Sequence, residues 1–258
     1  MAAECDIELL VRAARAAGHV ALTFRGAAQS WTKDDGTPVS EADLAANEAL
    51  RTILMGARPG YGWLSEEDGR ASGGPLSFIV DPIDGTRAYM RGDTYWTVVA
   101  AVLDGGRPVA GVIYRPFVDT LYCARLGGGA TRNGRPVHVS GRQELRDARV
   151  ALPGPLYRDG GFETAGVVRA HNVSSLALRL AKAGEGRLDA VITKSGPHHW
   201  DLAAADLFVH EAGGTLTNLS GETLDYAAET TSHGAVFAGT PDLAEPLRRM
   251  AARHDAAA

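Results

Sequence analysis

Two carboxylates three residues apart stand in the segment Asp81–Thr86, whose sequence is DPIDGT. The segment follows the apolar run Leu76–Val80, which predicts a buried strand. Carboxylates bind hard cations such as Mg²⁺, and a Gly-Thr pair at the start of a helix offers backbone N–H groups to a phosphate. The turn therefore suggests metal-assisted chemistry on a phosphate ester. Asp residues are also common in ordinary turns, where they accept local backbone hydrogen bonds.

Acidic residues elsewhere extend this pattern, and each also has a plain structural interpretation. Glu66 and Glu67 precede the same strand, and paired Glu residues usually stay solvated. Asp201 opens a helical pattern and is an acceptable N-cap. Asp43 follows Ser40 in an S-x-x-D pattern that is close to a capping box. If these side chains face one cleft, they would instead complete a cage of oxygen ligands.

The neighbouring His198 and His199 are a weak indication of zinc. Two adjacent histidines do not share a metal ion as an i, i+4 pair on a helix does. The ligand candidates elsewhere are all oxygens, and this favours Mg²⁺ over Zn²⁺.

The spacing of apolar residues indicates the elements that must position these side chains. Helical spacing predicts amphipathic helices at Asp6–Phe24 and, after the N-cap Ser40, at Glu41–Met55. The polar segment Gln29–Pro38 between them is expected to be a loop. Strand patterns and turn signals then predict an antiparallel meander, with strands at Trp96–Leu103, Pro108–Tyr114, Thr120–Ala124 and near Ala130.

The polar stretch Ser140–Asp147 is the best candidate for a boundary within the chain. Beyond it, short strands alternate with helices, and this argues for an α/β arrangement. These strands are expected at Arg149–Leu152, Asp189–Thr193 and Gly234–Ala238, and the helices at Ser174–Ala183, Asp201–Ala212 and Pro241–His254. The sequence thus predicts an α+β half (1–145) with most of the candidate ligands and an α/β half (146–258) that supplies Asp201, together one compact catalytic unit.

The overall composition excludes several classes of protein. The 26 basic and 31 acidic residues give a formal net charge of −5 over 258 residues, so we expect no nucleic-acid partner. The first residues are acidic and no segment is long and apolar enough for a membrane span, so we expect neither a signal peptide nor a membrane partner. Cys5 and Cys123 are too few for a disulfide framework. We interpret them as reduced thiols of a cytoplasmic protein.

Taken in order, the motifs resemble those of the inositol monophosphatase superfamily. Its Glu-Glu loop corresponds to Ser65–Glu67, and its D-P-[IL]-D-G-[ST] motif to Asp81–Thr86. Its W-D-x-A-A and E-A-G-G motifs are similar to Trp200–Ala204 and Glu211–Gly214, and its "P-V-T-x-A-D" helix start to Pro38–Asp43. The resemblance spans nearly the whole chain.

This resemblance implies a layered αβαβα sandwich and a Li⁺-sensitive phosphomonoesterase that uses two or three Mg²⁺ ions. The metal ligands it implies are Glu66, Asp81, the carbonyl of Ile83, Asp84 and Asp201. Asp81 would bridge two of the ions. In-line attack by water, without a phosphoenzyme, is implied as well.

The resemblance also assigns roles around the phosphate. Glu66, Thr86 and Asp43 would be catalytic, with Thr86 and Asp43 beside the attacking water. Gly85 and Thr86 would present backbone N–H groups to the phosphate. Lys33 would match the lysine of the family's mobile loop.

The substrate is less well defined by the sequence. Relatives that act on inositol phosphate carry a Glu shortly before the W-D motif, where this chain has Thr193 and Lys194. Lys194 suits a second anionic group, as in 3′-phosphoadenosine 5′-phosphate, or is simply exposed. The segment Gly85–Tyr89, GTRAY, is closer to the bacterial 3′(2′),5′-bisphosphate nucleotidases than to the G-T-T-N-F of inositol-type members, and His199 joins the candidate substrate contacts. Inositol phosphate, histidinol phosphate and fructose 1,6-bisphosphate are further candidate substrates that the sequence does not exclude.

Two other classes of function compete with a phosphatase that acts on a small phosphorylated metabolite. One is a non-catalytic regulatory or binding protein on the same fold, and the other is a structural Ca²⁺-binding domain. The family often forms dimers, and the meander offers strand edges for a homodimer, but no residue fixes the oligomeric state.

Overall fold

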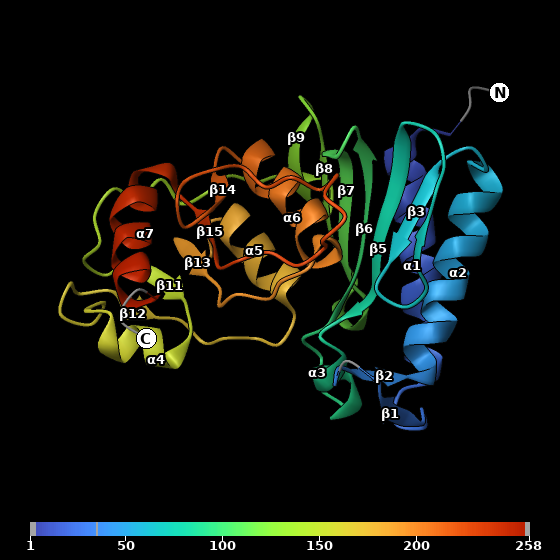
Figure 1. The fold of residues 1–258 in the computed structure, drawn as a ribbon, viewed down its shortest axis with the longest axis horizontal. Coiled ribbons are helices and arrows are strands. Elements are labelled where there is room, and N and C mark those ends of the chain that lie inside the picture. Colours follow the sequence, from blue (N-terminus) through green and yellow to red (C-terminus); the bar gives the residue numbers. More distant parts are fainter. Residues whose placement is uncertain (1–3, 35, 256–258) are drawn as a thin grey trace.

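Helices and sheets alternate as αβαβα across the molecule (Figure 1). The computed structural model describes residues 4–34 and 36–255. Its helices are α1 (Asp6–Thr23), α2 (Glu41–Ala57), α3 (Thr86–Met90), α4 (Gly154–Asp159), α5 (Leu176–Gly184), α6 (His199–Glu211) and α7 (Pro241–Asp255). The sandwich implied by the resemblance is therefore present.

An eight-stranded sheet forms the larger of the two β layers. In spatial order its strands are β10 (Arg135–Pro136), β9 (Gly129–Arg132), β8 (Thr120–Arg125), β7 (Arg107–Arg115), β6 (Thr97–Asp104), β5 (Leu76–Asp84), β3 (Gly62–Ser65) and β4 (Gly69–Ala71). Strands β6 to β10 pair antiparallel in chain order, so the predicted meander is confirmed. Only β3 and β5 pair in parallel among the strands of this sheet that the structure describes.

The smaller sheet has five strands and mixed directions. Its spatial order is β12 (Val168–Arg169), β11 (Arg149–Ala151), β13 (Ala190–Ile192), β15 (Val236–Gly239) and β14 (Thr215–Asn218). The expected strand and helix segments of this half are all present, with shifted ends. Strand β14 was not predicted, and β15 runs antiparallel to both of its neighbours.

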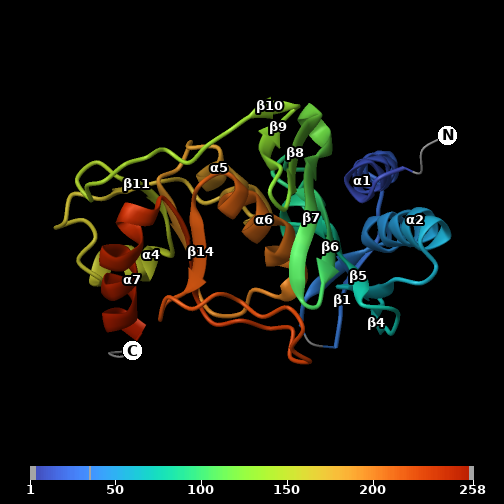
Figure 2. The same cartoon turned by 90° about the horizontal axis from the view of Figure 1, so that it is seen from above.

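Both faces of the large sheet are buried, and this explains the continuous apolar run of β6. Val98, Ala100 and Val102 pack toward α1 and α2. The alternate residues Val99 and Ala101 pack toward α5 and α6, as the two-residue period of a strand requires. Figure 2 shows α1 and α2 on one side of this sheet and α5 and α6 on the other. A third apolar cluster lies between the small sheet and α7.

The segment that was expected to be a loop, Gln29–Pro38, contains one short strand and ends at the first residue of another. Strand β1 (Ser30–Thr32) pairs antiparallel with β2 (Pro38–Ser40). The pattern was not visible in the sequence because Ser30, Trp31 and Thr32 are all exposed, so β1 has no apolar face. This hairpin leads directly into α2.

None of the helices in the described part of the chain combines the length and apolar character needed to cross a bilayer. The two cysteines are free thiols, Cys5 exposed and Cys123 partly buried.

Helix α6 packs closely on the large sheet at Gly111. A Cβ atom on Gly111 would lie 3.0 Å from the Cα of Ala204 and 3.1 Å from its carbonyl oxygen. We therefore expect Gly111→Ala to lower the free energy of unfolding by about 1–3 kcal/mol through overpacking. Urea denaturation measures this change.

Gly56→Ala in α2 is the matched control, because its new Cβ meets no atom within 4 Å. This variant should be unchanged or more stable by up to about 1 kcal/mol, since Ala favours the helix. Equal stability of the two variants would contradict the close packing of α6.

Candidate active site

A bulge at the end of β5 brings Asp81 and Asp84 to one side of the sheet. Residues three apart on a regular strand face opposite sides. Here Asp81 pairs with Val99 and Asp84 with Thr97, so three steps along β5 match two along β6. The extra residue of such a bulge turns the second side chain back to the side of the first. The Asp81 carboxylate also accepts the N–H of Ile83 at 3.0 Å, which stabilises the turn.

The parallel pairing of β3 and β5 places Glu66 beside Asp81. Ser65 lies in register with Val80, so the residues that follow both strands are neighbours. The Glu66 N–H donates to the carbonyl of Val80 at 3.4 Å. The two carboxylates therefore meet at the carboxyl ends of these strands, and Glu67 lies next to them.

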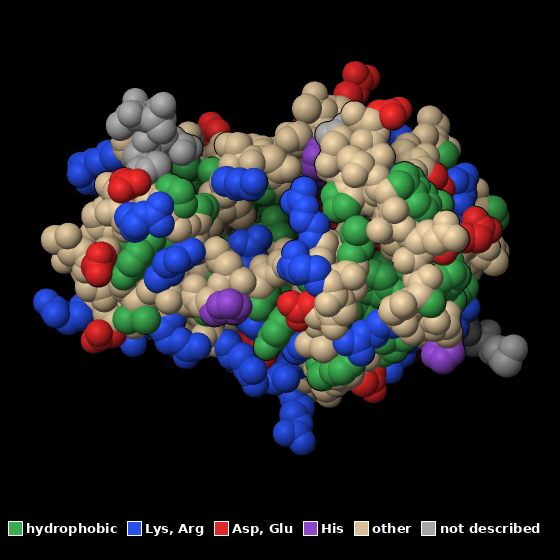
Figure 3. Space-filling view, turned by 90° about the horizontal axis from the view of Figure 1, so that it is seen from below, with side chains coloured by type: hydrophobic (Ala, Val, Ile, Leu, Met, Phe, Trp, Pro, Cys, Tyr) green, Lys and Arg blue, Asp and Glu red, His purple; other side chains and the backbone are tan. Residues whose placement is uncertain are grey.

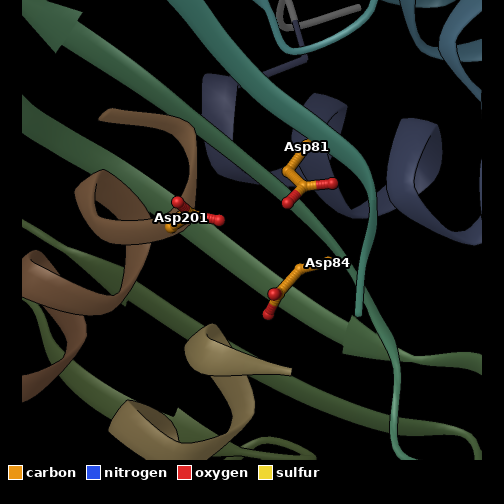
Figure 4. Close-up of side chains that lie close together, drawn as sticks. All are labelled: Asp81, Asp84 and Asp201. Atoms are coloured by element: carbon orange, nitrogen blue, oxygen red, sulfur yellow. The ribbon is translucent and has the colours of Figure 1, made fainter. Parts of the chain in front are cut away.

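Helix α6 supplies the third side of the carboxylate cluster through Asp201. The helix begins at His199, so Asp201 is its third residue and not the N-cap that the sequence suggested. One of its oxygens accepts the N–H of His198 at 2.6 Å. Carboxylate oxygens of Asp81, Asp84 and Asp201 lie within 4.8 Å of one another, and Figure 4 shows the three side chains converging from the sheet and the helix.

Asp84 also joins the large sheet to the start of α5. Its Oδ2 accepts the Ser175 hydroxyl at 2.6 Å and the Ala177 N–H at 2.8 Å. Its Oδ1 accepts the Leu176 N–H at 3.0 Å. The exposed N–H groups of a helix start stabilise a carboxylate. Asp84 is therefore held by the second half of the chain as well as by its own strand.

Thr86 and Asp43 meet on the other side of the turn. The Thr86 hydroxyl lies 3.1 Å from both Asp43 Oδ1 and the carbonyl oxygen of Ile83. Asp43 Oδ2 accepts the backbone N–H and the hydroxyl of Ser40, at 2.8 and 2.5 Å. Asp43 therefore caps α2 and contacts Thr86 at once, so the two interpretations of its sequence pattern do not exclude each other.

Lys33 reaches the Glu pair from the β1–β2 hairpin. Its ammonium lies 2.8 Å from Glu67 Oε2 and 3.5 Å from Glu66 Oε1. Burial lowers the pKa of Lys33, but the hydrogen bond to Glu67 and the two glutamate charges raise it overall. Lys33 therefore stays charged and holds the hairpin over the carboxylate cluster.

Burial and mutual repulsion disfavour the charged form of the carboxylates. The pKa of Glu66 rises to about 7, mainly through burial, against the opposing charge of Lys33. The pKa of Asp201 rises to about 8 through burial and the charge of Asp84. Burial and the charge of Glu66 raise the pKa of Asp81 well above its usual value. Such a site gains stability when a cation compensates the charge.

A cavity of about 330 Å³ opens onto these groups. It is lined by Thr37, Pro38, Glu66, Asp81, Ile83, Asp84, Gly85, Thr86, Arg87, Arg91, Ser174 and Asp201. The donor set is oxygen only, which suits Mg²⁺. The backbone N–H groups of Gly85 and Thr86 donate no hydrogen bond within the described residues, and Gly85 has a φ of +101°. The cavity thus combines a place for hard cations with free N–H donors.

Two predicted substrate contacts are not brought to this cavity. The side chain of His199 is fully buried. Its Nδ1 lies 2.7 Å from His233 Nε2, and its Nε2 lies 3.2 Å from the carbonyl oxygen of Ala228. The prediction that His199 contacts substrate is therefore wrong for this arrangement, because the first residue of α6 points into the core. Lys194 is exposed and does not line the cavity.

Sequence reasoning missed Ser174, Ser175 and Arg91 at the site. Ser174 and Arg91 line the cavity, and Ser175 donates to Asp84. Ser175 carries a recognisable signal, since Ser before an apolar helix is a typical N-cap, and its hydroxyl does accept the N–H of Leu178. Nothing in the sequence indicates that the same helix start would meet Asp84.

Comparison with known proteins agrees with this geometry. A family model described as the inositol monophosphatase family matches residues 3–253. An inositol-1-monophosphatase from Mesorhizobium japonicum is 35% identical over 256 residues, covering 93% of this chain and 93% of that protein. A histidinol-phosphatase from Mycobacterium tuberculosis is 37% identical over 209 residues, covering 74% and 77%. The crystal structure of extragenic suppressor protein suhB from Bartonella henselae superposes with a TM-score of 0.85 at 32% identity, covering 94% of this chain and 96% of that one.

The fold and the site define a layered α/β protein with a carboxylate-lined cleft at the ends of its central strands. The chain belongs to the inositol monophosphatase family.

The raised carboxylate pKa values predict how metal-free stability depends on pH. Between the ordinary pKa and the raised one, the folded protein binds more protons than the unfolded chain, so its stability falls as pH rises. For Glu66 and Asp201 this range ends near pH 7 and pH 8. We expect thermal unfolding with a chelator present to show falling stability from about pH 6 to pH 8, and Mg²⁺ to remove most of the fall.

Glu66→Gln isolates the contribution of one carboxylate. Because it removes a group that must lose its proton in this range, it should make the slope shallower and stabilise the metal-free protein near pH 8 by about 1–3 kcal/mol. The control is Glu144→Gln, an exposed residue outside the cavity. Identical slopes for wild type and Glu66→Gln would contradict the electrostatic description of the site.

Proposed function

We propose that the protein is a Mg²⁺-dependent phosphomonoester hydrolase that acts on a small phosphorylated metabolite. The convergence of Asp81, Asp84 and Asp201 within 4.8 Å beside Gly85 and Thr86 is the observation that carries this proposal. Membership of the family supports it. So do the names of the relatives, one an inositol-1-monophosphatase and another a histidinol-phosphatase.

Two or three Mg²⁺ ions would be held by the carboxylate cluster and its neighbours. The ligands we assign are Glu66, Asp81, the carbonyl of Ile83, Asp84 and Asp201. When bound, these ions supply positive charge for the phosphate and the leaving oxygen and lower the pKa of water. Inhibition by Li⁺ is expected on the same proposal, since the site selects small hard cations.

The turn after β5 would hold the phosphate. The N–H groups of Gly85 and Thr86 are free to donate to a phosphate oxygen. At Gly85 a Cβ would approach the backbone N of Ser175 to 3.2 Å and Tyr95 O to 3.3 Å, and the positive φ also favours Gly. The turn therefore requires glycine at this position.

Thr86 and Asp43 would manage the proton of the attacking water. Because the Thr86 hydroxyl can donate to Asp43 Oδ1, its lone pairs are free to accept a proton from a water in the cleft. Burial raises the pKa of Asp43, although the hydrogen bonds from Ser40 oppose this. Asp43 is thus able to receive the proton that Thr86 passes on, as a general base requires. Lys33 would keep the hairpin closed over the water.

The substrate class stays at the level of a small phosphate ester. Inositol phosphate and 3′-phosphoadenosine 5′-phosphate are the two candidates we favour, with histidinol phosphate as a third that rests on a relative's name. The exposed position of Lys194 weakens its proposed contact with a second phosphate. A cytoplasmic homodimer stays a prediction from the sequence.

Asp84→Asn tests the proposed chemistry. We expect the rate of Mg²⁺-dependent phosphate release to fall by about 100-fold or more, because a charged metal ligand becomes neutral. Phosphate release from a panel of small esters measures it, with circular dichroism to verify folding. Asp104→Asn, an exposed Asp at the end of β6, is the matched control and should keep its activity. Full activity in folded Asp84→Asn would rule out this assignment.

Thr86→Val tests the proton path without a change of volume. The variant loses the hydroxyl that contacts Asp43, and we expect kcat to fall by about 100-fold. Thr86→Ser restores a hydroxyl and should recover most of kcat. If Thr86→Val and Thr86→Ser were equally active, the hydroxyl would have no role in proton transfer.

A further inference from the structure

One wall of the cavity is basic. Arg87 of α3 and Arg91, the residue that caps the end of this helix, both line the cavity that contains the carboxylate cluster. Arg91 follows the last residue of this short helix and stands four positions after Arg87. Both residues are exposed, and neither forms an ion pair with a carboxylate in the described part of the chain. Their charges are therefore available to a ligand.

The start of α5 continues this wall. Arg91 Nη2 lies 3.5 Å from the hydroxyl of Ser174, which also lines the cavity. Arg179 lies further along, in the first turn of α5, and is not among the residues that line the cavity; its Nε is buried without a hydrogen-bond acceptor among the described residues. Burial lowers the pKa of Arg179, and the charges of Asp84 and Asp201 oppose this. Its guanidinium thus lies within electrostatic reach of both carboxylates.

Lys33 is already paired with carboxylates. It contacts Glu66 and Glu67 from the β1–β2 hairpin. Asp84 receives three hydrogen bonds from the N-cap and first turn of α5, none of them from an arginine. If bound metal ions neutralise Asp84 and Asp201, the positive charge of Arg179 is no longer balanced by these carboxylates. It then adds to the charges of Arg87 and Arg91. Figure 3 shows Lys and Arg side chains along the middle of this face, between the two halves of the molecule.

We propose that Arg87 and Arg91 form a second anion subsite, to which the buried charge of Arg179 adds from behind the cavity lining, so that the preferred substrates carry a second phosphate or carboxylate beside the phosphate that is hydrolysed. This inference rests on the proposed phosphatase function and narrows its substrate class. Guanidinium groups bind planar and tetrahedral anions through paired hydrogen bonds. The same charges repel an ammonium group, so an amino-phosphate ester is a poor substrate and a neutral polyol phosphate is intermediate.

A series of butyl phosphates separates the subsite from the chemistry. Its members end in a second phosphate, a carboxylate, a methyl group or an ammonium group, and all carry the same type of scissile phosphate ester. The bisphosphate carries this ester at both ends, so its kcat/KM is compared per ester group. We expect kcat/KM with Mg²⁺ to fall in that order, with the bisphosphate at least about tenfold above butyl phosphate, as one charge-assisted hydrogen bond supplies. The carboxylate arm distinguishes recognition of any anion from recognition of phosphate.

Three variants test the residues: Arg87→Met, Arg91→Met and Arg179→Met. Each should lower the ratio of kcat/KM for the bisphosphate to kcat/KM for butyl phosphate by about threefold to tenfold. Arg179→Lys keeps the positive charge and should retain more of this ratio. It also replaces Arg179→Met as the test if that variant fails to fold. Arg249→Met, on α7 and paired with Glu245, is the control and should leave the ratio unchanged.

A binding measurement keeps the two proposals distinguishable. Calorimetry with Mg²⁺ compares butane-1,4-bisphosphonate with butylphosphonate, neither of which can be hydrolysed as an ester. If the bisphosphonate binds more tightly than butylphosphonate, and the arginine variants lose this difference, the result supports the subsite. It does so even if no ester is hydrolysed, because a lack of hydrolysis contradicts only the phosphatase proposal. Hydrolysis of butyl phosphate and of the bisphosphate at equal kcat/KM, with equal binding of both phosphonates, overturns the subsite and leaves the phosphatase proposal standing.

Discussion

Asp81, Asp84, Asp201 and Glu66 lie together in one cleft, and their mutual repulsion is the constraint on which the rest of the site depends. A charged carboxylate away from water is costly unless it is paired or hydrogen-bonded. The fold places these groups together in spite of that cost, through a bulge in β5, a parallel strand pair and the start of α6. Such an arrangement persists because the surrounding layers hold it rigidly.

The compensation comes from three directions. Backbone N–H groups at the starts of α5 and α6 donate to Asp84 and Asp201. Lys33 provides a positive charge from the hairpin. The charge that remains is what a divalent cation would balance, so metal binding is expected to stabilise the carboxylate cluster. Arg87 and Arg91 line the same cavity, and their positive charges are opposite in sign to the carboxylate cluster.

Much of this arrangement could be predicted from the sequence, for reasons that differ between elements. The spacing of apolar residues was sufficient to predict α1, α2 and the meander, because each of these elements has a continuous buried face. The identities of the acidic residues followed from their order along the chain. Their geometry did not, since i, i+3 spacing on a strand predicts opposite faces, and only the bulge between Asp81 and Asp84 reverses this. The three bonds from α5 to Asp84 join residues about ninety positions apart and leave no local pattern. The substrate contact predicted for His199 was also wrong, because the sequence does not show which way each side chain of α6 points. Asp201 faces the cleft, whereas His199, two residues earlier, faces the core.

The most direct test of the central claim is anomalous diffraction from crystals grown with Mn²⁺, which takes the same oxygen ligands as Mg²⁺. The account predicts one or more strong anomalous peaks between the carboxylates of Asp81, Asp84 and Asp201. It also predicts that the peak is lost in Asp201→Asn crystals of the same form. Crystals saturated with Mn²⁺ that show no peak at these carboxylates would contradict the account.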